Sequence, residues 1–62
     1  MRIFKYQWDR MSDESVIDFW KSHNYSKAYD NMGKVPGWGF PSIESLNNFY
    51  NCLEQMKERD LL

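Results

Sequence analysis

The sequence has few of the residues that build catalytic and metal sites. Among its 62 residues are one cysteine, one histidine, three glycines and two prolines. A disulfide within the chain is excluded because Cys52 is the only cysteine, and an unpaired cysteine is typical of a reducing compartment. A zinc site needs several ligands at regular spacing. We therefore expect a cytoplasmic protein that holds neither a metal nor a cofactor.

An excess of charge and a long apolar run are also absent. The formal net charge is −1, so the molecule as a whole has no field that would attract nucleic acid or an acidic membrane. Residues 1–8 alternate with charges and contain no uninterrupted apolar run, which argues against a signal peptide and a membrane span. We expect no membrane association, and a simple cationic binder is disfavoured.

The sequence contains no recognisable catalytic set. His23 is the one candidate for a general base at neutral pH, but the pattern predicts it at the end of a helix beside Phe19 and Trp20, in a structural role. Cys52 falls on an apolar stripe, which favours a small buried hydrophobic residue over a nucleophile. Neither a nucleophile elbow nor a Gly-rich phosphate loop is present. The sequence predicts no enzymatic activity.

Aromatic residues are what the chain has in abundance. It contains three Trp, four Tyr and four Phe, in a length near the lower limit for folding without disulfides or metal. Each ring buries a large area with few rotatable bonds. We expect a single domain, residues 1–62, with a largely aromatic core. Rings left outside that core become candidate anchors for a partner.

The strongest structural pattern covers residues 42–61. At ~100° per residue, this stretch predicts an amphipathic helix that lies across the core, with Ser42 at its start. The rest of the chain then covers its apolar half. That half holds Ile43, Leu46, Phe49, Tyr50, Cys52, Leu53 and Met56. The other half, expected to face solvent, holds Glu44, Asn47, Asn48, Asn51, Glu54, Gln55, Glu58 and Arg59.

Three shorter elements precede this helix. Residues 2–8 alternate, with Phe4, Tyr6 and Trp8 on one face, which predicts a half-buried strand. Ser12 is placed to cap a helix over residues 13–23, with acidic residues in its first turn. Ser26 is placed to cap a short helix over residues 27–32.

The connection to the last helix is predicted to be a turn. Gly33 supplies a left-handed stop for the short helix, and Pro36 with Gly37 suits a type II turn over residues 35–38. The predicted fold class is α+β, an N-terminal strand packed with two main amphipathic helices and a short middle helix. The alternative is a small three-helix domain with an extended N-terminal arm.

The candidate binding residues lie between positions 25 and 40. Trp38 stands between two glycines in a loop bounded by Pro36 and Pro41, so it is either a lid on the core or an exposed anchor. Lysines interleaved with aromatic residues also suit the stacking of nucleic acid bases, although a small core needs the same rings. The predicted partner-binding residues are Tyr25, Tyr29, Lys34, Trp38 and Phe40.

We expect a small protein-binding module, such as an adaptor, an inhibitor or an accessory subunit of a larger protein. The abundance of Asn, Tyr, Phe and Lys in a short chain is also typical of phage-encoded proteins that act on a host factor. A homodimer through the exposed part of the last helix is a further hypothesis, because dimerisation enlarges a small core. The alternative function is nucleic-acid binding, with phosphate contacts from Arg2, Lys5, Arg10, Lys27 and Lys34.

Overall fold

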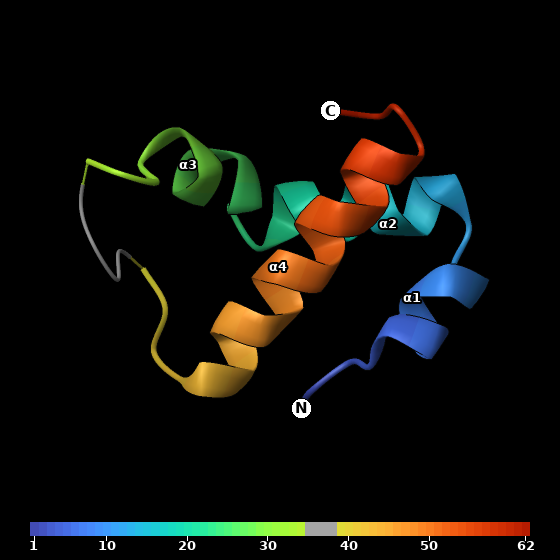
Figure 1. Ribbon diagram of the computed structural model, residues 1–62, viewed down its shortest axis with the longest axis horizontal. Coiled ribbons are helices and arrows are strands. Elements are labelled where there is room, and N and C mark those ends of the chain that lie inside the picture. Colours follow the sequence, from blue (N-terminus) through green and yellow to red (C-terminus); the bar gives the residue numbers. More distant parts are fainter. Residues whose placement is uncertain (35–38) are drawn as a thin grey trace.

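A computed structural model describes residues 1–34 and 39–62. These residues form four helices, α1 (Lys5–Arg10), α2 (Asp13–Ser22), α3 (Tyr25–Asp30) and α4 (Ile43–Glu58). Figure 1 shows α4 running diagonally across the molecule, with α1 at one end of the long axis and α3 at the other. Helix α4 packs on α1 and α2, and α2 packs in turn on α3. The predicted last helix is therefore the central element.

The predicted N-terminal strand is wrong, and with it the α+β fold class. Residues 5–10 form α1, and no strand occurs in residues 1–34 and 39–62. A single strand would leave its backbone groups without a partner strand, whereas a helical turn satisfies them internally. Gln7 strengthens that turn, because its Oε1 accepts a hydrogen bond from the Phe4 N–H at 2.8 Å. The three-helix alternative also fails at this point, since it treated the arm as extended.

The alternation of aromatic residues in this segment does not mark one face. Trp8 is fully buried, whereas the side chains of Phe4 and Tyr6 are 48% and 59% exposed. In a helix, residues two apart point in different directions, so the rings separate into one core residue and two surface residues. The period of two was therefore coincidental.

Helix α2 agrees with its prediction. Ser12 is the N-cap, and its Oγ accepts a hydrogen bond from the Ser15 N–H at 3.2 Å. Asp13 and Glu14 occupy the first turn, where the helix dipole favours acidic side chains. The helix ends at Ser22, one residue earlier than predicted.

The short helix α3 exists, but its predicted start was wrong. It begins at Tyr25 and follows Asn24, which adopts a left-handed conformation with φ 56°. Asn tolerates this conformation better than most residues, so the chain reverses between α2 and α3 without a glycine. Gly33 has φ 83°, in agreement with the predicted left-handed stop. The predicted type II turn over residues 35–38 lies outside the described residues.

The core is aromatic, and Phe49 of α4 is at its centre. The ring centroids of Phe40, Tyr25 and Trp20 lie 5.0, 5.7 and 6.1 Å from the centroid of the Phe49 ring. Such offset and edge contacts add to the stabilisation from burial. The buried hydrophobic residues are Trp8, Val16, Trp20, Tyr25, Ala28, Phe49, Cys52, Leu53 and Met56.

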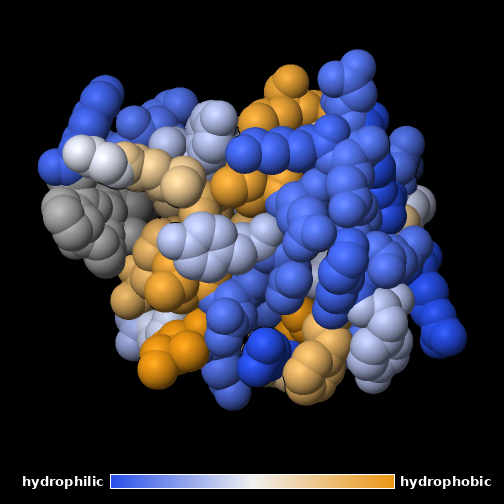
Figure 2. All heavy atoms as spheres, in the orientation of Figure 1, coloured by the Kyte–Doolittle hydropathy of each residue, from blue (hydrophilic) through white to orange (hydrophobic). Residues whose placement is uncertain are grey.

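The predicted apolar half of α4 was too wide. Phe49 and Leu53 are buried and Leu46 is half-buried, as expected, but Ile43 is 77% exposed and Tyr50 is 52% exposed. In the opposite sense Gln55, predicted to face solvent, is only 2% exposed. The buried side of α4 is therefore rotated toward α1. Figure 2 shows hydrophobic side chains gathered on the α3 side of this view and hydrophilic ones on the α1 side.

Helix α4 also ends earlier than predicted. Its last residue is Glu58, and Asp60 takes a left-handed conformation with φ 57°. The Asp60 N–H donates to the Lys57 carbonyl at 3.1 Å, and the Leu61 N–H donates to the Met56 carbonyl at 2.8 Å. This pair of bonds is a Schellman closure, which satisfies two terminal carbonyls and turns Leu61 back toward the core.

A row of polar side chains on α4 holds the N-terminal segment. We call this row the polar seam, and it consists of Asn48, Asn51, Gln55 and Arg59. Asn48 Oδ1 accepts from the Ile3 N–H at 2.8 Å, while Asn51 Nδ2 donates to the Ile3 carbonyl at 3.4 Å. Gln55 Nε2 donates to Asp9 Oδ1. Helix α1 is therefore docked by hydrogen bonds as well as by the burial of Trp8.

Arg59 closes the seam at the far end of α1. Its guanidinium donates to the carbonyls of Trp8 and Met11 at 3.1 and 2.8 Å and to the Asp13 carboxylate at 2.8 Å. Its Nε donates to Gln55 Oε1 at 3.1 Å. One side chain thus joins the end of α1, the start of α2 and the end of α4. Its side chain is only 17% exposed, although the sequence pattern placed it on the solvent face.

Candidate protein-binding site

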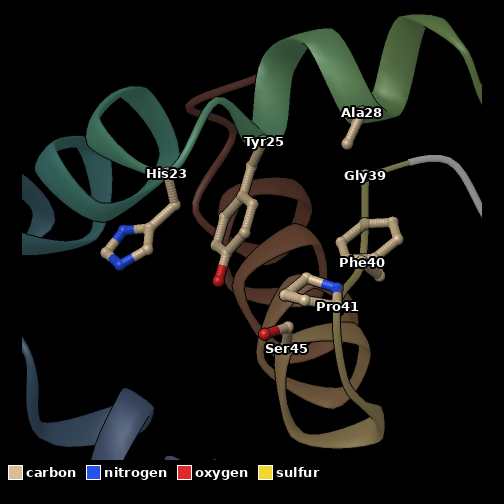
Figure 3. A pocket seen from close by; sticks show the side chains of 7 residues that line it. All are labelled: His23, Tyr25, Ala28, Gly39, Phe40, Pro41 and Ser45. Carbon is tan, nitrogen blue, oxygen red and sulfur yellow. The ribbon is translucent and has the colours of Figure 1, made fainter.

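A hollow of about 200 Å³ opens between the end of α2, helix α3 and the segment that leads into α4. Figure 3 shows the Tyr25 side chain pointing from α3 toward Ser45 on α4, with His23 on one side and Phe40 and Pro41 on the other. The lining residues are His23, Tyr25, Ala28, Gly39, Phe40, Pro41 and Ser45.

Local backbone features place these side chains together. The left-handed Asn24 separates His23 at the end of α2 from Tyr25 at the start of α3, so both rings reach the same space. Ala28 follows one helical turn after Tyr25, and its small side chain leaves room in the wall. On the opposite side Gly39 has φ 71°, a conformation that favours glycine.

The walls of the hollow are stacked rings. The centroid of the His23 ring lies 4.9 Å from that of Phe19, with an interplanar angle of 7°. It lies 5.4 Å from that of Tyr25, with an angle of 28°. His23 Nδ1 lies 3.2 Å from the Phe19 carbonyl and 3.1 Å from Ser22 Oγ. These contacts fix the orientation of the imidazole. The predicted structural role of His23 is consistent with them.

The polar groups of the hollow are uncharged hydroxyls and an imidazole. Burial, followed by the nearby Cys52 thiol, raises the pKa of Tyr25 above its ordinary value of 10.0, so its phenol stays protonated at neutral pH and can donate a hydrogen bond. Ser45 adds a second hydroxyl. Its oxygen accepts a hydrogen bond from Ser42 Oγ at 3.2 Å. Among the described residues, no carboxylate, ammonium or guanidinium belongs to the lining. The hollow therefore suits an uncharged side chain.

The structure brings together two of the five predicted partner-binding residues. Tyr25 and Phe40 form opposite walls of the hollow (Figure 3). Tyr25 is 6% exposed, so it acts as a wall and does not project from the surface. Phe40 is half-buried against Phe49.

Of the other three predicted residues, Tyr29 and Lys34 are not among the lining residues. The centroid of the Tyr29 ring lies 6.1 Å from that of the Trp20 ring and 6.0 Å from Lys57 Nζ. Lys34 is exposed in the turn after α3. Trp38 lies outside the described residues. Their predicted role in binding stays a prediction.

Sequence reasoning missed most of the lining. His23, Ala28, Gly39, Pro41 and Ser45 come from two separated stretches of the chain, residues 23–28 and 39–45, and they meet only in the folded structure. The chain reversal at Asn24 is the feature that decides this geometry. A lone Asn between two helical patterns was the available signal, and it was read only as the end of the first helix.

Cys52 and the acidic residues were the other candidates for a chemical site. Cys52 is fully buried, with its Sγ 3.9 Å from the Val16 carbonyl, and burial raises its pKa to about 12. Its thiolate is therefore scarce at neutral pH. No three His, Cys, Asp or Glu side chains converge to hold a metal ion within residues 1–34 and 39–62.

Two further findings concern surfaces. None of the helices in the described residues combines the length and apolar character needed to cross a bilayer. On the outer face of α4, Ile43 and Tyr50 are exposed one above the other, two turns apart. This is the face available to the predicted homodimer, which stays a prediction.

Compared with models of known families, with curated proteins and with solved structures, the chain matches none. Its function is therefore inferred from its own residues.

Proposed function

We propose that the protein is a small protein-binding module that receives one uncharged side chain of a larger protein partner in the hollow beside Tyr25. The observation that supports this proposal most directly is the aromatic wall made by His23, Tyr25 and Phe40 around a space that, among the described residues, is lined by no Asp, Glu, Lys or Arg. Apolar clefts with a few placed polar groups are the usual form of a recognition site.

The size and chemistry of the hollow favour an aromatic or branched aliphatic side chain. Burying such a side chain contributes roughly 1.5–3 kcal/mol, which is the scale of a single binding hot spot. The Tyr25 and Ser45 hydroxyls add direction, because each can exchange a hydrogen bond with a polar tip or a backbone group of the partner. A partner tyrosine satisfies both requirements best.

The mode of action that follows is occupation of a partner surface in the cytoplasm, as by an inhibitor or an accessory subunit. The walls of the hollow are held in place by the Phe49 core, so little ordering is needed on binding. The protein contributes a preformed surface and no chemistry of its own.

The test is to fill the hollow without disturbing the core. Ser45→Leu on α4 places an apolar side chain in the opening, and Asn47→Leu adds the same group to the half-buried position two residues along, outside the lining. Both variants are expected to keep wild-type helix content by circular dichroism.

Binding is then measured by heteronuclear NMR with N-acetyltyrosinamide and N-acetylleucinamide as side-chain probes. We expect the amide signals of Tyr25, Ala28, Gly39 and Ser45 to shift in the wild type and in Asn47→Leu, but not in Ser45→Leu. A partner captured from the source cell should follow the same pattern. Equal capture by Ser45→Leu, or probe shifts that avoid the hollow, would overturn the proposal.

A further inference from the structure

A second surface feature lies at the opposite end of the molecule, on α1 and the residues before it (Figure 1). The Phe4 and Tyr6 rings are stacked, with centroids 6.1 Å apart and an interplanar angle of 9°. The Arg2 guanidinium lies 5.1 Å from the centroid of Phe4, and the Arg10 guanidinium lies 5.9 Å from that of Tyr6. We call these four residues the Arg–aromatic stack.

Within the described residues, no ion pair joins Arg2 or Arg10 of the stack to a carboxylate. The carboxylates of this region pair with other cations: Glu44 lies 3.3 Å from the N-terminal ammonium, and Asp9, Glu54 and Glu58 lie 3.6, 3.5 and 3.5 Å from Lys5 Nζ. Desolvation lowers the pKa of Lys5, but its carboxylate partners outweigh it and leave the pKa raised. These carboxylates are paired with the N-terminal ammonium and with Lys5, which leaves Arg2 and Arg10 for an outside anion.

In this arrangement the N–H donors of each guanidinium remain available for hydrogen bonds while the group stays close to a ring. A guanidinium near a ring face is attracted to it electrostatically, and its planar fork of N–H donors matches the oxygens of a phosphate. The rings are half-exposed, so they also offer apolar surface to a planar group. Stacking thus orders two cations and two rings on one surface.

The polar seam holds the stack in place. The backbone on either side of Ile3 is bound by Asn48 and Asn51, and the Phe4 N–H donates to Gln7. Because this segment is already ordered, binding there loses little conformational entropy. The exposed rings are therefore a fixed platform.

We propose that the Arg–aromatic stack binds single-stranded nucleic acid, with phosphates at Arg2 and Arg10 and a base against Phe4 or Tyr6. Proteins that bind single strands combine cations along the backbone with aromatic rings on which bases stack. An acidic peptide would use the cations but has no planar groups for the rings. A duplex keeps its bases paired, so the rings would have no base to stack with. The proposed protein-binding hollow is independent of this surface.

The proposal predicts that binding depends weakly on salt concentration, with a slope that reports the number of phosphate contacts. Each phosphate contact to a single strand contributes a slope of about −0.7 in log K against log salt concentration, so two contacts give roughly −1.4. We measure binding of a short fluorescein-labelled oligothymidine and of oligouridine to the whole protein by fluorescence anisotropy over a series of salt concentrations.

Substitutions of the arginines and of the rings distinguish the contribution of charge to binding from that of base stacking. Arg2→Ala and Arg10→Ala should each lower the slope to roughly −0.7, while Lys21→Ala, which removes an exposed cation of α2, should leave it unchanged. The double variant Arg2→Lys with Arg10→Lys should keep the slope and bind more weakly, because an ammonium group does not stack as a guanidinium does. Phe4→Ala with Tyr6→Ala should weaken binding by roughly tenfold or more.

Three results would overturn the proposal. The first is no oligonucleotide binding at low salt, with folding confirmed by circular dichroism. The second is binding of polyglutamate or of a matched DNA duplex as tight as that of the single strand. The third is a slope that Arg2→Ala and Arg10→Ala leave at the wild-type value. Ser45→Leu should bind the oligonucleotide normally, so failure here is distinguishable from failure of the protein-binding proposal.

Discussion

The two flanks of α4 are held to the rest of the chain by different physics. On one flank Phe49, Leu53 and Met56 pack against rings and aliphatic side chains of α2 and α3. On the other flank the polar seam binds the backbone of residues 1–11 through amide and guanidinium groups. The contacts of the first flank depend on which side chains of α4 are apolar. Those of the second depend on where the backbone N–H and carbonyl groups of residues 1–11 lie in the folded chain. The comparison teaches that a polar helix face can be an internal surface.

The largest test of this comparison is Phe49→Ala on the apolar flank. Removal of a fully buried ring at the centre of the aromatic core should lower the free energy of unfolding by about 3–5 kcal/mol, enough to unfold much of a domain this small. Urea denaturation followed by circular dichroism measures the loss. Tyr50→Ala, which removes the neighbouring half-exposed ring 5.4 Å from Phe49 between centroids, is the control and should cost much less, about 1 kcal/mol. Equal losses in both variants would contradict the position of Phe49 in the core.

The second test is Arg59→Ala on the polar flank. The substitution leaves the carbonyls of Trp8 and Met11 without their guanidinium donor, and hydrogen bonds to charged groups each contribute about 1.5–3 kcal/mol. We expect a loss of about 2–3 kcal/mol, smaller than for Phe49→Ala because water can reach part of the vacated site.

Lys57→Ala is the matched control for Arg59→Ala, since it removes an exposed cation from the same last turn of α4. It should change the free energy of unfolding very little. Hydrogen exchange adds a local readout, because the amides of α1 should lose protection in Arg59→Ala. A stability of Arg59→Ala equal to that of Lys57→Ala would show that the polar flank does not hold α1.

The third test uses pH to probe the apolar flank. Burial raises the pKa of Cys52 from 9.0 to about 12 in the folded protein. A group with a raised folded pKa contributes stability that is complete below its unfolded pKa and is lost as the pH rises toward its folded pKa. The contribution of Cys52 should therefore be unchanged below pH 9.0 and fall by about 1 kcal/mol over the first pH unit above it.

Unfolding in urea at a series of pH values measures this loss. Cys52→Ala should be less stable overall because it leaves a cavity, but its decline over the same pH unit should be shallower. Tyr25 and Lys5, whose pKa values are also raised, contribute to the remaining slope. A native thiol that reacts with a disulfide reagent as fast as the unfolded chain would contradict the burial of Cys52.

How far the sequence predicted the structure depends on the kind of interaction. The caps at Ser12 and Ser42 were predictable because each serine bonds an amide three residues away. The side of α4 that carries Phe49 and Leu53 was predictable from helical periodicity alone. The N-terminal segment was not, because six residues with alternating rings are compatible with a strand or a helix, and only docking on Asn48, Asn51 and Gln55 decides between them.

The candidate site was predicted in part for the same reason. Tyr25 and Phe40 were identified as aromatic residues in one segment, and both line the hollow. Their partners His23 and Ser45 come from the end of α2 and the start of α4, and no local pattern joins those positions. Arg2 and Arg10 of the Arg–aromatic stack were named as phosphate contacts of the alternative function, but its rings were missed because Phe4 and Tyr6 were placed with Trp8 on one face of a half-buried strand, whereas both are exposed.

The amino-acid sequence by itself determined that the chain would be a small aromatic domain around an amphipathic last helix, because composition, capping and helical periodicity act over a few residues. The tertiary structure decided that Arg59 and Gln55 would be internal, that Ile43 would face water, and that two separated segments would enclose a hollow. Those outcomes depend on hydrogen bonds and burial between residues more than forty positions apart in several cases. Such contacts exist only once the chain has folded.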